Sequence, residues 1–302
     1  MLQNGRILSG LGGSLYQVRL DNGMDISCYA RGLFRYKNET VTVGDYVSVE
    51  LEPDGGGAIR DIAERKNLLI RPPIANLDML FVVVAAAAPE PLLITIDKMI
   101  SIAEYNDIEP VIIVTKSDLD STKADYISGI YKQSGFDVFT GTDGLTEFIE
   151  SHGKQKTAAF AGASGVGKST LMNRLFPKRM SLNTGEISRK TSRGKHTTRH
   201  VELFPISELT DNTAYTGYLA DTPGFGLLDF IKFDFFTKES LIFTFREFEP
   251  YITTCKYTKC THIKEEGCSI IEAVNSGIIP KERHTNYIEI YNDLKDKREW
   301  KK

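Results

Sequence analysis

The stretch Gly162-Ala163-Ser164-Gly165-Val166-Gly167-Lys168-Ser169 decides how the central part of this chain folds. It satisfies the pattern G-x-x-x-x-G-K-[ST] at every fixed position. A short apolar run, Thr157–Ala161, precedes it, and a helix is expected to open near Lys168. In such a strand–loop–helix unit the glycines let successive backbone N–H groups point at one anion. The sequence therefore predicts an α/β domain with a parallel sheet that binds a nucleoside triphosphate.

The side chains of this phosphate-binding loop have distinct expected roles. Lys168 is expected to reach the β- and γ-phosphates, and the Ser169 hydroxyl to ligate Mg²⁺. The alternative, a glycine turn formed by chance, is disfavoured by the strand before the loop and the helix after it. The nucleotide-binding residues predicted here are Gly162, Ala163, Ser164, Gly165, Val166, Gly167, Lys168, Ser169 and Thr170.

A second motif, Thr115-Lys116-Ser117-Asp118, follows the buried apolar run Val111–Val114 and resembles the N/T-K-x-D base-recognition motif of GTPases. An aspartate there accepts hydrogen bonds from N1–H and the exocyclic amine of guanine, a donor pair that adenine lacks. Thr115 stands where asparagine is commoner. Alone, the motif would equally be a charge pair that solvates a loop. Beside a phosphate-binding loop, it predicts guanine recognition through Thr115, Lys116, Ser117 and Asp118.

A third motif, Asp221-Thr222-Pro223-Gly224, follows the strand-like run Tyr218–Ala220. In P-loop proteins an aspartate at this point holds Mg²⁺ and the glycine N–H meets the γ-phosphate, so Asp221 and Gly224 join the predicted site. Taken alone, the same four residues would be a helix cap and a turn.

The segment Ser192–His200 lies between the phosphate-binding loop and this third motif. A threonine here is expected to complete the magnesium shell, and Thr198 is preferred over Thr197. Many GTPases orient the attacking water with a glutamine after the third motif, but this chain has Phe225 there. His196 is therefore the nearest candidate to position the water. The alternative is that His196 contacts RNA or solvent.

The order of these motifs is unusual. In ordinary GTPases the base-recognition motif comes last, whereas here Thr115–Asp118 precedes the phosphate-binding loop. A circular permutation explains this order, because a sheet is unchanged when its termini are joined and a loop is opened elsewhere.

The cysteines near the C-terminus have the spacing of a metal site. Cys255, Cys260, His262 and Cys268 form C-x4-C-x-H-x5-C, which predicts one closed structural zinc site with no open position for catalysis. Redox or incidental cysteines are the alternative. Cys28 lies in an expected strand and is interpreted as a small buried apolar residue.

The flanks of the central domain differ from it in pattern. Residues 5 to about 70 contain short alternating runs and an Asp21-Asn22-Gly23 turn, which predicts a small β-barrel such as the oligonucleotide-binding (OB) fold, although a barrel without nucleic-acid function fits equally. Arg71-Pro72-Pro73 is interpreted as a linker. Leu93–Tyr105 is expected to be an amphipathic helix with Asp97 and Lys98 on its polar side, and Pro280 is expected to begin a C-terminal helix.

Composition sets limits on the partners. The chain has 302 residues, enough for two or three domains, with 37 Lys+Arg against 40 Asp+Glu and a formal charge of −3. Positive charge is nevertheless concentrated in Arg189, Lys190, Arg193, Lys195 and Arg199, and in Lys256, Lys259 and Lys264, which favours an RNA partner. No apolar run is long enough for a membrane span and the start has no secretory pattern, so we expect a soluble, cytoplasmic protein.

The permuted motifs, the leading barrel, the sequence Gly194–Thr198 and the trailing C-x4-C-x-H-x5-C together resemble the ribosome small-subunit-dependent GTPase A family, known as RsgA, YjeQ or YloQ. The resemblance covers essentially the whole chain. It implies an OB-fold barrel (1–71), a circularly permuted GTPase domain (72–230) and a zinc-binding, mostly helical domain (231–302).

The resemblance also implies a function. A family member is a late assembly factor that binds GTP or GDP and the small ribosomal subunit with its rRNA, and the subunit stimulates its GTP hydrolysis. The family's catalytic histidine falls on His196, its zinc ligands on the Cys/His cluster, and its magnesium ligands on Ser169, Thr198 and Asp221. We expect a monomer. The fifth base-contacting motif is assigned to Thr140–Gly144. Two alternatives stay open at this point: a stand-alone nucleotide hydrolase, and a GTP-gated RNA-binding translation regulator not dedicated to subunit assembly.

Overall fold

The computed structural model describes residues 2–30, 34, 39–53, 55–178, 201–212, 216–221 and 236–295. Contacts within the chain divide it into two compact units, and each is described by itself. The first unit comprises Met1–Met79, Thr146–Phe160 and Met172–Phe225. The second unit comprises Leu80–Leu145, Ala161–Leu171 and Gly226–Lys302.

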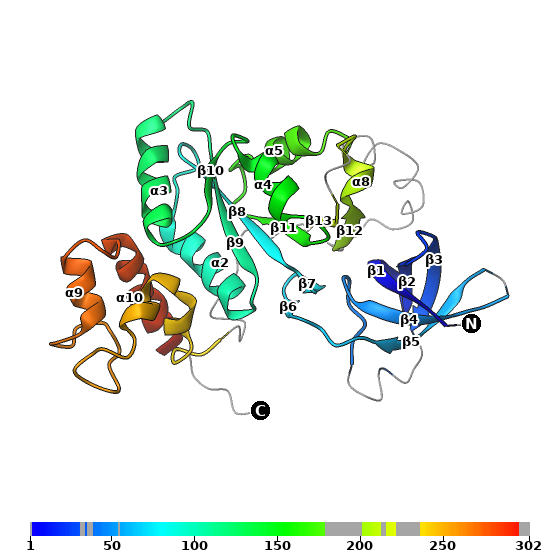
Figure 1. Cartoon of the computed structure of the whole chain (residues 1–302), viewed down its shortest axis with the longest axis horizontal. Coiled ribbons are helices and arrows are strands. Elements are labelled where there is room, and N and C mark those ends of the chain that lie inside the picture. Colours follow the sequence, from blue (N-terminus) through cyan, green and yellow to red (C-terminus); the bar gives the residue numbers. More distant parts are fainter. Residues whose placement is uncertain are drawn as a thin grey trace. The chain divides into compact units, whose positions relative to one another are not determined.

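The N-terminal part of the first unit is a closed five-stranded barrel, drawn in blue in Figure 1. Its strands pair in the order β1-β2-β3-β5-β4, and β4 pairs back to β1. The Asn22-Gly23 turn connects β2 to β3, and Gly23 has the positive φ of 85° that this turn requires. The barrel strands are β1 (Leu2–Gly12), β2 (Leu15–Leu20), β3 (Asp25–Ala30), β4 (Tyr46–Leu51) and β5 (Gly57–Ile62).

The interior of this barrel is apolar, as the alternating pattern predicts. Ile7, Val18, Val49 and Ile59 are each completely buried, one from each of four strands. Cys28 of β3 is buried among them, which confirms its interpretation as a core residue, and burial raises the pKa of its thiol to about 11. The predicted barrel is therefore confirmed.

The segment predicted to be a linker is instead the turn of a hairpin. Strands β6 (Leu68–Ile70) and β7 (Pro73–Ala75) pair antiparallel, with Ile70 opposite Pro73. The prediction was wrong because consecutive prolines often mark linkers. Here Pro73 is the first residue of strand β7 in a two-stranded sheet, where its missing N–H is tolerated.

The rest of the first unit extends the sheet beyond the barrel. Strand β12 (Glu202–Pro205) pairs antiparallel with β1 at Ser9, and with β13 (Tyr218–Asp221) on its other side. Strand β13 in turn runs parallel to β11 (Thr157–Ala161). The helices α4 (Leu145–His152) and α8 (Ile206–Leu209) accompany these strands.

The second unit contains the parallel strands that the apolar runs predict. Every residue of β8 (Met79–Ala85) is buried, as are six of the seven residues of β9 (Glu109–Thr115). Strand β10 (Val138–Thr140) pairs parallel with β9. The accompanying helices are α2 (Leu93–Tyr105), with the predicted bounds, and α3 (Ser121–Gln133), while α5 (Lys168–Leu175) begins where the phosphate-binding loop ends.

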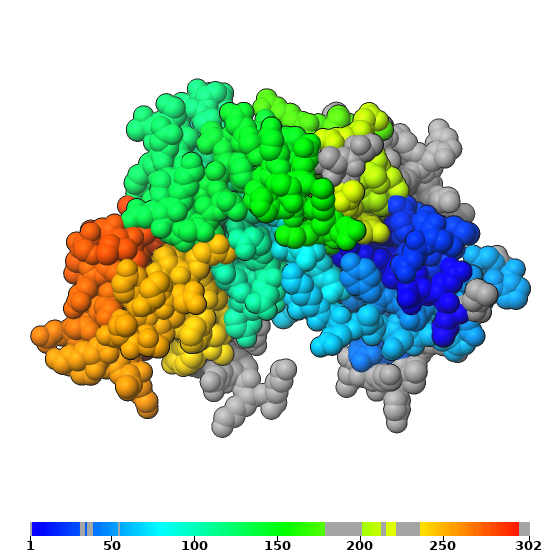
Figure 2. All heavy atoms as spheres, viewed as in Figure 1, coloured from blue at the N-terminus to red at the C-terminus, as the bar shows by residue number. Residues whose placement is uncertain are grey.

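The C-terminal part of the second unit is helical. It contains the short 3-10 helices η1 (Leu241–Thr244) and η2 (Arg246–Tyr251), followed by α9 (Ser269–Asn275) and α10 (Lys281–Lys295). Its atoms, yellow to red in Figure 2, lie against those of α2, and hydrogen bonds connect it to Tyr126 and Gln133 of α3. Asp97 of α2 was expected on a polar face, but it is completely buried because it pairs there with Arg283 of α10.

Across the helices that the structure describes, none combines the length and apolar character that a membrane crossing requires.

Candidate nucleotide site and metal centre

The phosphate-binding loop leaves β11 and is held closely against β8. Gly162 has a φ of 145°, and a Cβ placed on it would lie 2.3 Å from the carbonyl oxygen of Val83. Gly167, with a φ of 95°, turns the chain into α5. A side chain at Gly162 would collide with the Val83 carbonyl oxygen, and the positive φ of Gly167 strains any residue with a Cβ, so the backbone path itself favours glycine at both positions.

Lys168 begins α5 and folds its side chain back over this loop. Its ammonium donates hydrogen bonds to the carbonyl oxygens of Gly162 at 2.7 Å and Ala163 at 2.6 Å. Burial lowers the pKa of Lys168, because desolvation disfavours the charged form. A phosphate at this position would supply the negative charge that favours the ammonium form. Ser169, in the first turn of α5, is exposed.

The base-recognition motif is tied to the phosphate-binding loop by Thr115. Its hydroxyl lies 2.5 Å from the carbonyl oxygen of Val166 and 3.2 Å from that of Val84. This buried hydroxyl therefore joins the carboxyl ends of β8 and β9 to the loop. The substitution of threonine for the commoner asparagine keeps a polar link between the two motifs.

Lys116 makes a second link from the same motif. It has a positive φ of 58°, and its ammonium donates to the carbonyl oxygen of Gly165 at 2.9 Å and to that of Ala88. Asp118, two residues further on, is exposed. The motif thus places a fixed lysine stem and an accessible carboxylate beside the phosphate-binding loop, as stacking on a guanine and accepting its hydrogen bonds would require.

The loop assigned to the fifth base-contacting motif, Thr140–Gly144, lies next to Thr115–Asp118. Strand β10 pairs with β9 so that Thr140 is opposite Val114, and the amide of Gly141 donates to the carbonyl oxygen of Val114 at 2.8 Å. The assignment remains a prediction, and its position at the same sheet edge agrees with it.

Asp221 ends β13 in the first unit. Strand β13 is parallel to β11, from which the phosphate-binding loop departs, so Asp221 lies at the carboxyl edge where ligands of α/β sheets bind. Glu202 of β12 is directly opposite Asp221. Burial, and next the charge of Asp221, raise the pKa of Glu202. The Ser169 hydroxyl and the Asp221 carboxylate are hard oxygen donors of the kind that Mg²⁺ prefers.

Three of the predicted site residues, His196, Thr198 and Gly224, lie outside the described residues, as does the basic segment Ser192–His200. Their roles stay predictions.

The four residues of the predicted zinc site come together. Their ligand atoms all lie within 4.8 Å of one another. The Cys255 and Cys268 sulfurs are 3.8 Å apart, and His262 Nδ1 is 3.5 Å from the first and 3.4 Å from the second. A tetrahedral zinc ion gives edges of about 3.8 Å between sulfurs and about 3.6 Å between sulfur and nitrogen. The cluster therefore has the dimensions of a Cys3His zinc centre.

The pKa shifts of three of these residues, Cys260, His262 and Cys268, are consistent with a cluster that binds a metal ion. Burial is the main cause that raises the pKa of Cys260, to about 12, and of Cys268, and burial lowers the pKa of His262. Neutral imidazole is the form that ligates zinc, whereas the thiols would lose their protons when the metal binds.

Two residues outside the ligand set hold the loop that carries His262. The imidazole Nε2 of His284 is 2.7 Å from the His262 carbonyl oxygen, so it acts there as the donor. The Glu265 carboxylate accepts hydrogen bonds from the amides of Thr261, Ile263 and Lys264, at 2.9, 3.0 and 3.1 Å.

The sequence reasoning did not identify three of these contributors: Glu202, Glu265 and His284. Glu202 lies two residues after the basic segment in sequence, but only the strand register places it beside Asp221. Glu265 lies between the ligands His262 and Cys268 in the sequence, so of these three residues it is the one for which a local signal existed. His284 lies 22 residues beyond His262 and had none.

A family model described as RsgA GTPase matches residues 62–231, and one described as RsgA N-terminal domain matches residues 4–59. A Bacillus subtilis protein named "Small ribosomal subunit biogenesis GTPase RsgA" is 38% identical over 98% of this chain and 99% of its own length. A protein of the same name from Caldanaerobacter subterraneus is 39% identical over 97% and 96%.

Two solved structures are similar over nearly the whole chain. One, described as YloQ, a circularly permuted GTPase, superposes with a TM-score of 0.78 at 34% identity and covers 99% of this chain and 96% of its own. The other, YjeQ from Thermotoga maritima, gives a TM-score of 0.80 at 29% identity and covers 99% and 100%. They support the barrel, the permuted GTPase core and the helical C-terminal region described above. With the family models and the full-length relatives, they lead to one conclusion: this chain belongs to the RsgA GTPase family.

Proposed function

We propose that this protein hydrolyses GTP to GDP and phosphate and acts in the maturation of the small ribosomal subunit, which stimulates the hydrolysis. The observation that carries the GTPase assignment is the link between the base-recognition motif and the phosphate-binding loop through Thr115 and Lys116. The assembly role is supported by the names of the full-length relatives.

The proposed roles of the site residues follow the chemistry of each group. Asp118 accepts the guanine hydrogen bonds, Lys168 binds the phosphates, and Ser169, Thr198 and Asp221 hold Mg²⁺. His196 positions the attacking water, because Phe225 cannot. The N–H of Gly224 meets the γ-phosphate. Magnesium would neutralise the charge that develops on the phosphates when it is bound.

The deciding experiment measures GTP turnover with and without purified small ribosomal subunits. We expect a large increase with subunits, and equal rates would contradict the ribosome-stimulated function. In the same assay His196→Ala should lose the stimulation and retain GDP binding. The matched control is His152→Ala, an exposed histidine of α4 that stacks on Phe148 and belongs to none of the motifs, and it should behave as the unchanged protein.

The two alternatives give different outcomes. A nucleotide hydrolase without base selection would bind ADP as tightly as GDP, whereas Asp118 predicts strong preference for GDP. A translation regulator would co-sediment, when loaded with a non-hydrolysable GTP analogue, with polysomes instead of free small subunits. The names of the relatives do not favour that alternative.

We further propose one structural zinc ion at Cys255, Cys260, His262 and Cys268, contact with rRNA by the barrel and the zinc loop, a monomeric state, and a cytoplasmic location where subunits mature. We also propose the domain limits 1–71, 72–230 and 231–302. Metal analysis of the purified protein tests the zinc, with one equivalent expected, and Cys260→Ser should lower that content.

A further inference from the structure

The barrel and the strand that carries Asp221 share one buried arginine, Arg6 of β1. It is only 3% exposed, and its guanidinium lies over two aromatic rings. The Cζ atom is 4.7 Å from the ring centroid of Tyr46 in β4 and 4.6 Å from that of Tyr218 in β13. One ring belongs to the barrel and the other begins β13, so Arg6 connects them by a cation–π contact with each.

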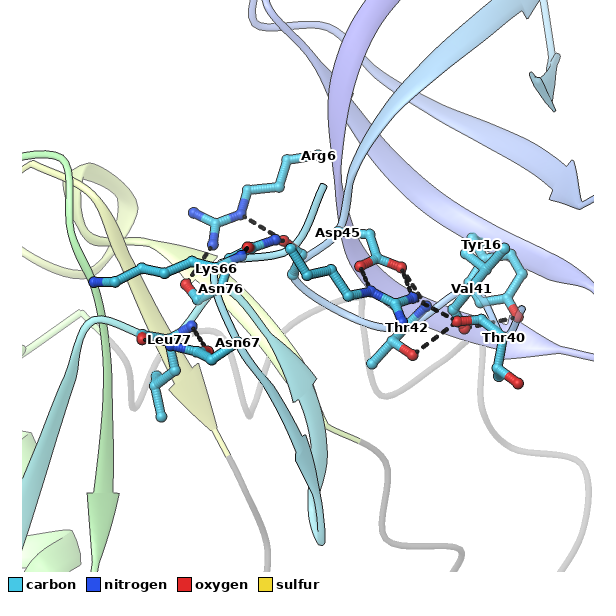
Figure 3. A network of polar contacts seen from close by, with 12 residues as sticks. Arg6, Tyr16, Thr40, Val41, Thr42, Asp45, Lys66, Asn67, Asn76 and Leu77 are labelled. Carbon is cyan, nitrogen blue, oxygen red and sulfur yellow. Dashed lines mark hydrogen bonds and ion pairs between the residues drawn. The ribbon is translucent and has the colours of Figure 1, made fainter. Parts of the chain in front are cut away.

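Hydrogen bonds fix the position of this guanidinium. Nε donates to the carbonyl oxygen of Gly44 and Nη2 to that of Asn76, both at 3.3 Å (Figure 3). Asn76 reinforces the arrangement, because its side-chain amide donates to the same Gly44 oxygen at 3.0 Å. Within the described residues, Nη1 has no hydrogen-bond partner. A guanidinium buried at the cost of an unsatisfied N–H indicates that its position matters beyond core packing.

The contacts continue from Asn76 to the strands of the GTPase core. Asp78, two residues later, binds the first residue of β11 twice: its amide donates to the Thr157 carbonyl oxygen, and its carboxylate accepts from the Thr157 amide, both at 2.9 Å. Thr157 is paired with Tyr218. Arg6, Asn76 and Asp78 therefore hold the amino end of β13 from two sides.

The carboxyl end of β13 is connected to the barrel by a second route. Ser9 of β1 is opposite Glu202 of β12, and Glu202 is opposite Asp221. Strand β13 has only four residues, Tyr218–Asp221, so its ends are about 10 Å apart and move together. A displacement of the barrel relative to β13 would therefore move the Asp221 carboxylate.

We propose that Arg6 is a positioning residue for GTP hydrolysis: it fixes β13 to the barrel, so that RNA bound at the barrel stabilises the magnesium-binding position of Asp221. This inference rests on the proposed function, in which Asp221 holds Mg²⁺ and the barrel contacts rRNA. It adds a route by which the subunit can accelerate hydrolysis without touching the nucleotide.

The test compares Arg6→Lys and Tyr218→Leu with the unchanged protein. Arg6→Lys keeps the positive charge but loses the planar guanidinium with its fixed N–H donors. Tyr218→Leu removes only the aromatic ring that β13 contributes. The matched control is Arg65→Lys. Arg65 is bonded to Asp45 and the Thr40 carbonyl oxygen, and in the part of the chain that the structure describes it has no bond to β13. For each protein we would measure GTP hydrolysis with and without small subunits, over a series of Mg²⁺ concentrations, and binding to subunits by co-sedimentation.

We expect both variants to bind subunits within about twofold of the unchanged protein, while the stimulation factor falls about tenfold. The Mg²⁺ concentration for half-maximal rate should rise more with subunits present than without them. Arg65→Lys should keep the stimulation.

Unchanged stimulation and Mg²⁺ dependence in Tyr218→Leu and Arg6→Lys would overturn the proposal. So would equal proportional losses with and without subunits, which is the signature of a merely destabilised fold. Should one variant fail to fold, the other decides the question alone. If the unchanged protein itself shows no stimulation, the proposed function fails, which is a separate result from failure of the Arg6 role.

Discussion

Thr115 shows how a single hydroxyl can connect two motifs of the nucleotide site. It lies at the end of β9, is 8% exposed, and is 2.5 Å from the carbonyl oxygen of Val166 in the phosphate-binding loop. Without that hydroxyl a buried carbonyl would lose its donor, and such an unsatisfied group costs about 1–3 kcal/mol. The geometry of the loop therefore depends on a residue of the base-recognition motif.

Replacing Thr115 with valine, which has nearly the same shape, should weaken GDP binding about tenfold, equivalent to about 1.4 kcal/mol. Thr115→Ser keeps the hydroxyl and should bind GDP within about twofold of the unchanged protein. Titration with a fluorescent GDP analogue measures both affinities. If the valine variant bound GDP as tightly as the serine variant, the link between the motifs would carry no binding energy.

Glu265 holds the zinc loop through hydrogen bonds although it is not one of the four predicted ligands. Burial would raise the pKa of this carboxyl, but hydrogen bonds from the hydroxyl and amide of Thr261 and from the amide of Lys264 hold it at about 2. Since that pKa lies below the ordinary 4.5, the carboxylate stabilises the folded loop at pH values above 4.5, and this stabilisation is lost as the pH falls toward 2.

Glu265→Gln should therefore lower the thermal unfolding midpoint at neutral pH, and the difference from the unchanged protein should shrink as the pH falls below 4.5. Chelator competition should show zinc affinity reduced about tenfold, as is usual when a residue that orients a ligand is changed. Glu266→Gln, at an exposed neighbour, is the control and should alter neither quantity. A pH-independent difference would assign the effect to something other than this carboxylate.

Among the helices, α10 is anchored to α2 by a buried group of charges. Arg283 donates to Asp97 at 2.5 Å and to Glu247 at 2.6 Å, and Asp97 also accepts from the Tyr131 hydroxyl at 2.9 Å and from the Asn286 amide at 2.5 Å. Both Arg283 and Asp97 are completely buried. Each of the Asp97 oxygens has a donor, so the charge is compensated as long as all of the partners remain.

Removing one partner should be costly. Arg283→Met leaves Asp97 as an uncompensated buried carboxylate, which should lower the free energy of unfolding by about 3–5 kcal/mol. Lys98→Ala breaks a partly exposed pair with Asp293 on the same two helices and should cost less than about 1 kcal/mol. Urea unfolding of both variants measures the difference. Equal, small losses would show that the buried pair contributes no more than the partly exposed one.

These same elements show which parts of the fold were predictable from sequence. The bounds of Leu93–Tyr105, the buried run of β9 and the loop before α5 were predicted correctly, because periodicity and glycine spacing are local properties. Asp97 was placed on a polar face because its partner Arg283 lies 186 residues away, beyond any local pattern. The hairpin turn at Arg71–Pro73 was missed because its strands are three residues long and have no period to detect.

The site follows the same division between local and long-range features. The Cys/His cluster and the nucleotide motifs were predictable, since residue types and spacing define them. The contacts of Thr115 and Lys116 with the loop were not predictable, because they depend on where the parallel strands end. The position of Glu202 opposite Asp221 was not predictable either, because it depends on the register of an antiparallel strand that contains no recognisable motif. Permutation does not alter these contacts, because they are made by strand ends whose arrangement is independent of where the chain begins.

Over the whole molecule, a formal charge of −3 conceals how positive charge is distributed. Lys256, Lys259 and Lys264 are all exposed on the zinc loop, and the Lys256 ammonium is 5.4 Å from the ring centroid of the exposed Tyr257. A loop that presents several lysines, one of them beside an aromatic ring, suits a phosphate backbone and an unpaired base. The loop should therefore contribute an electrostatic share of the affinity for the subunit, while the net charge limits binding to nucleic acid in general.

That share has a measurable salt dependence. If the three lysines contact phosphates, replacing all three with alanine should reduce the slope of log K against log salt concentration by about 2–3, since each phosphate contact contributes about 0.7–0.9. Co-sedimentation with small subunits over a series of salt concentrations gives the slope. Lys98→Ala and Lys123→Ala serve as controls, because those ammonium groups are already paired with Asp293 and Glu90, and they should leave the slope unchanged. A triple variant with the original slope but weaker binding at every salt concentration would mean that the loop acts through its shape, and the lysines would then have no phosphate partners.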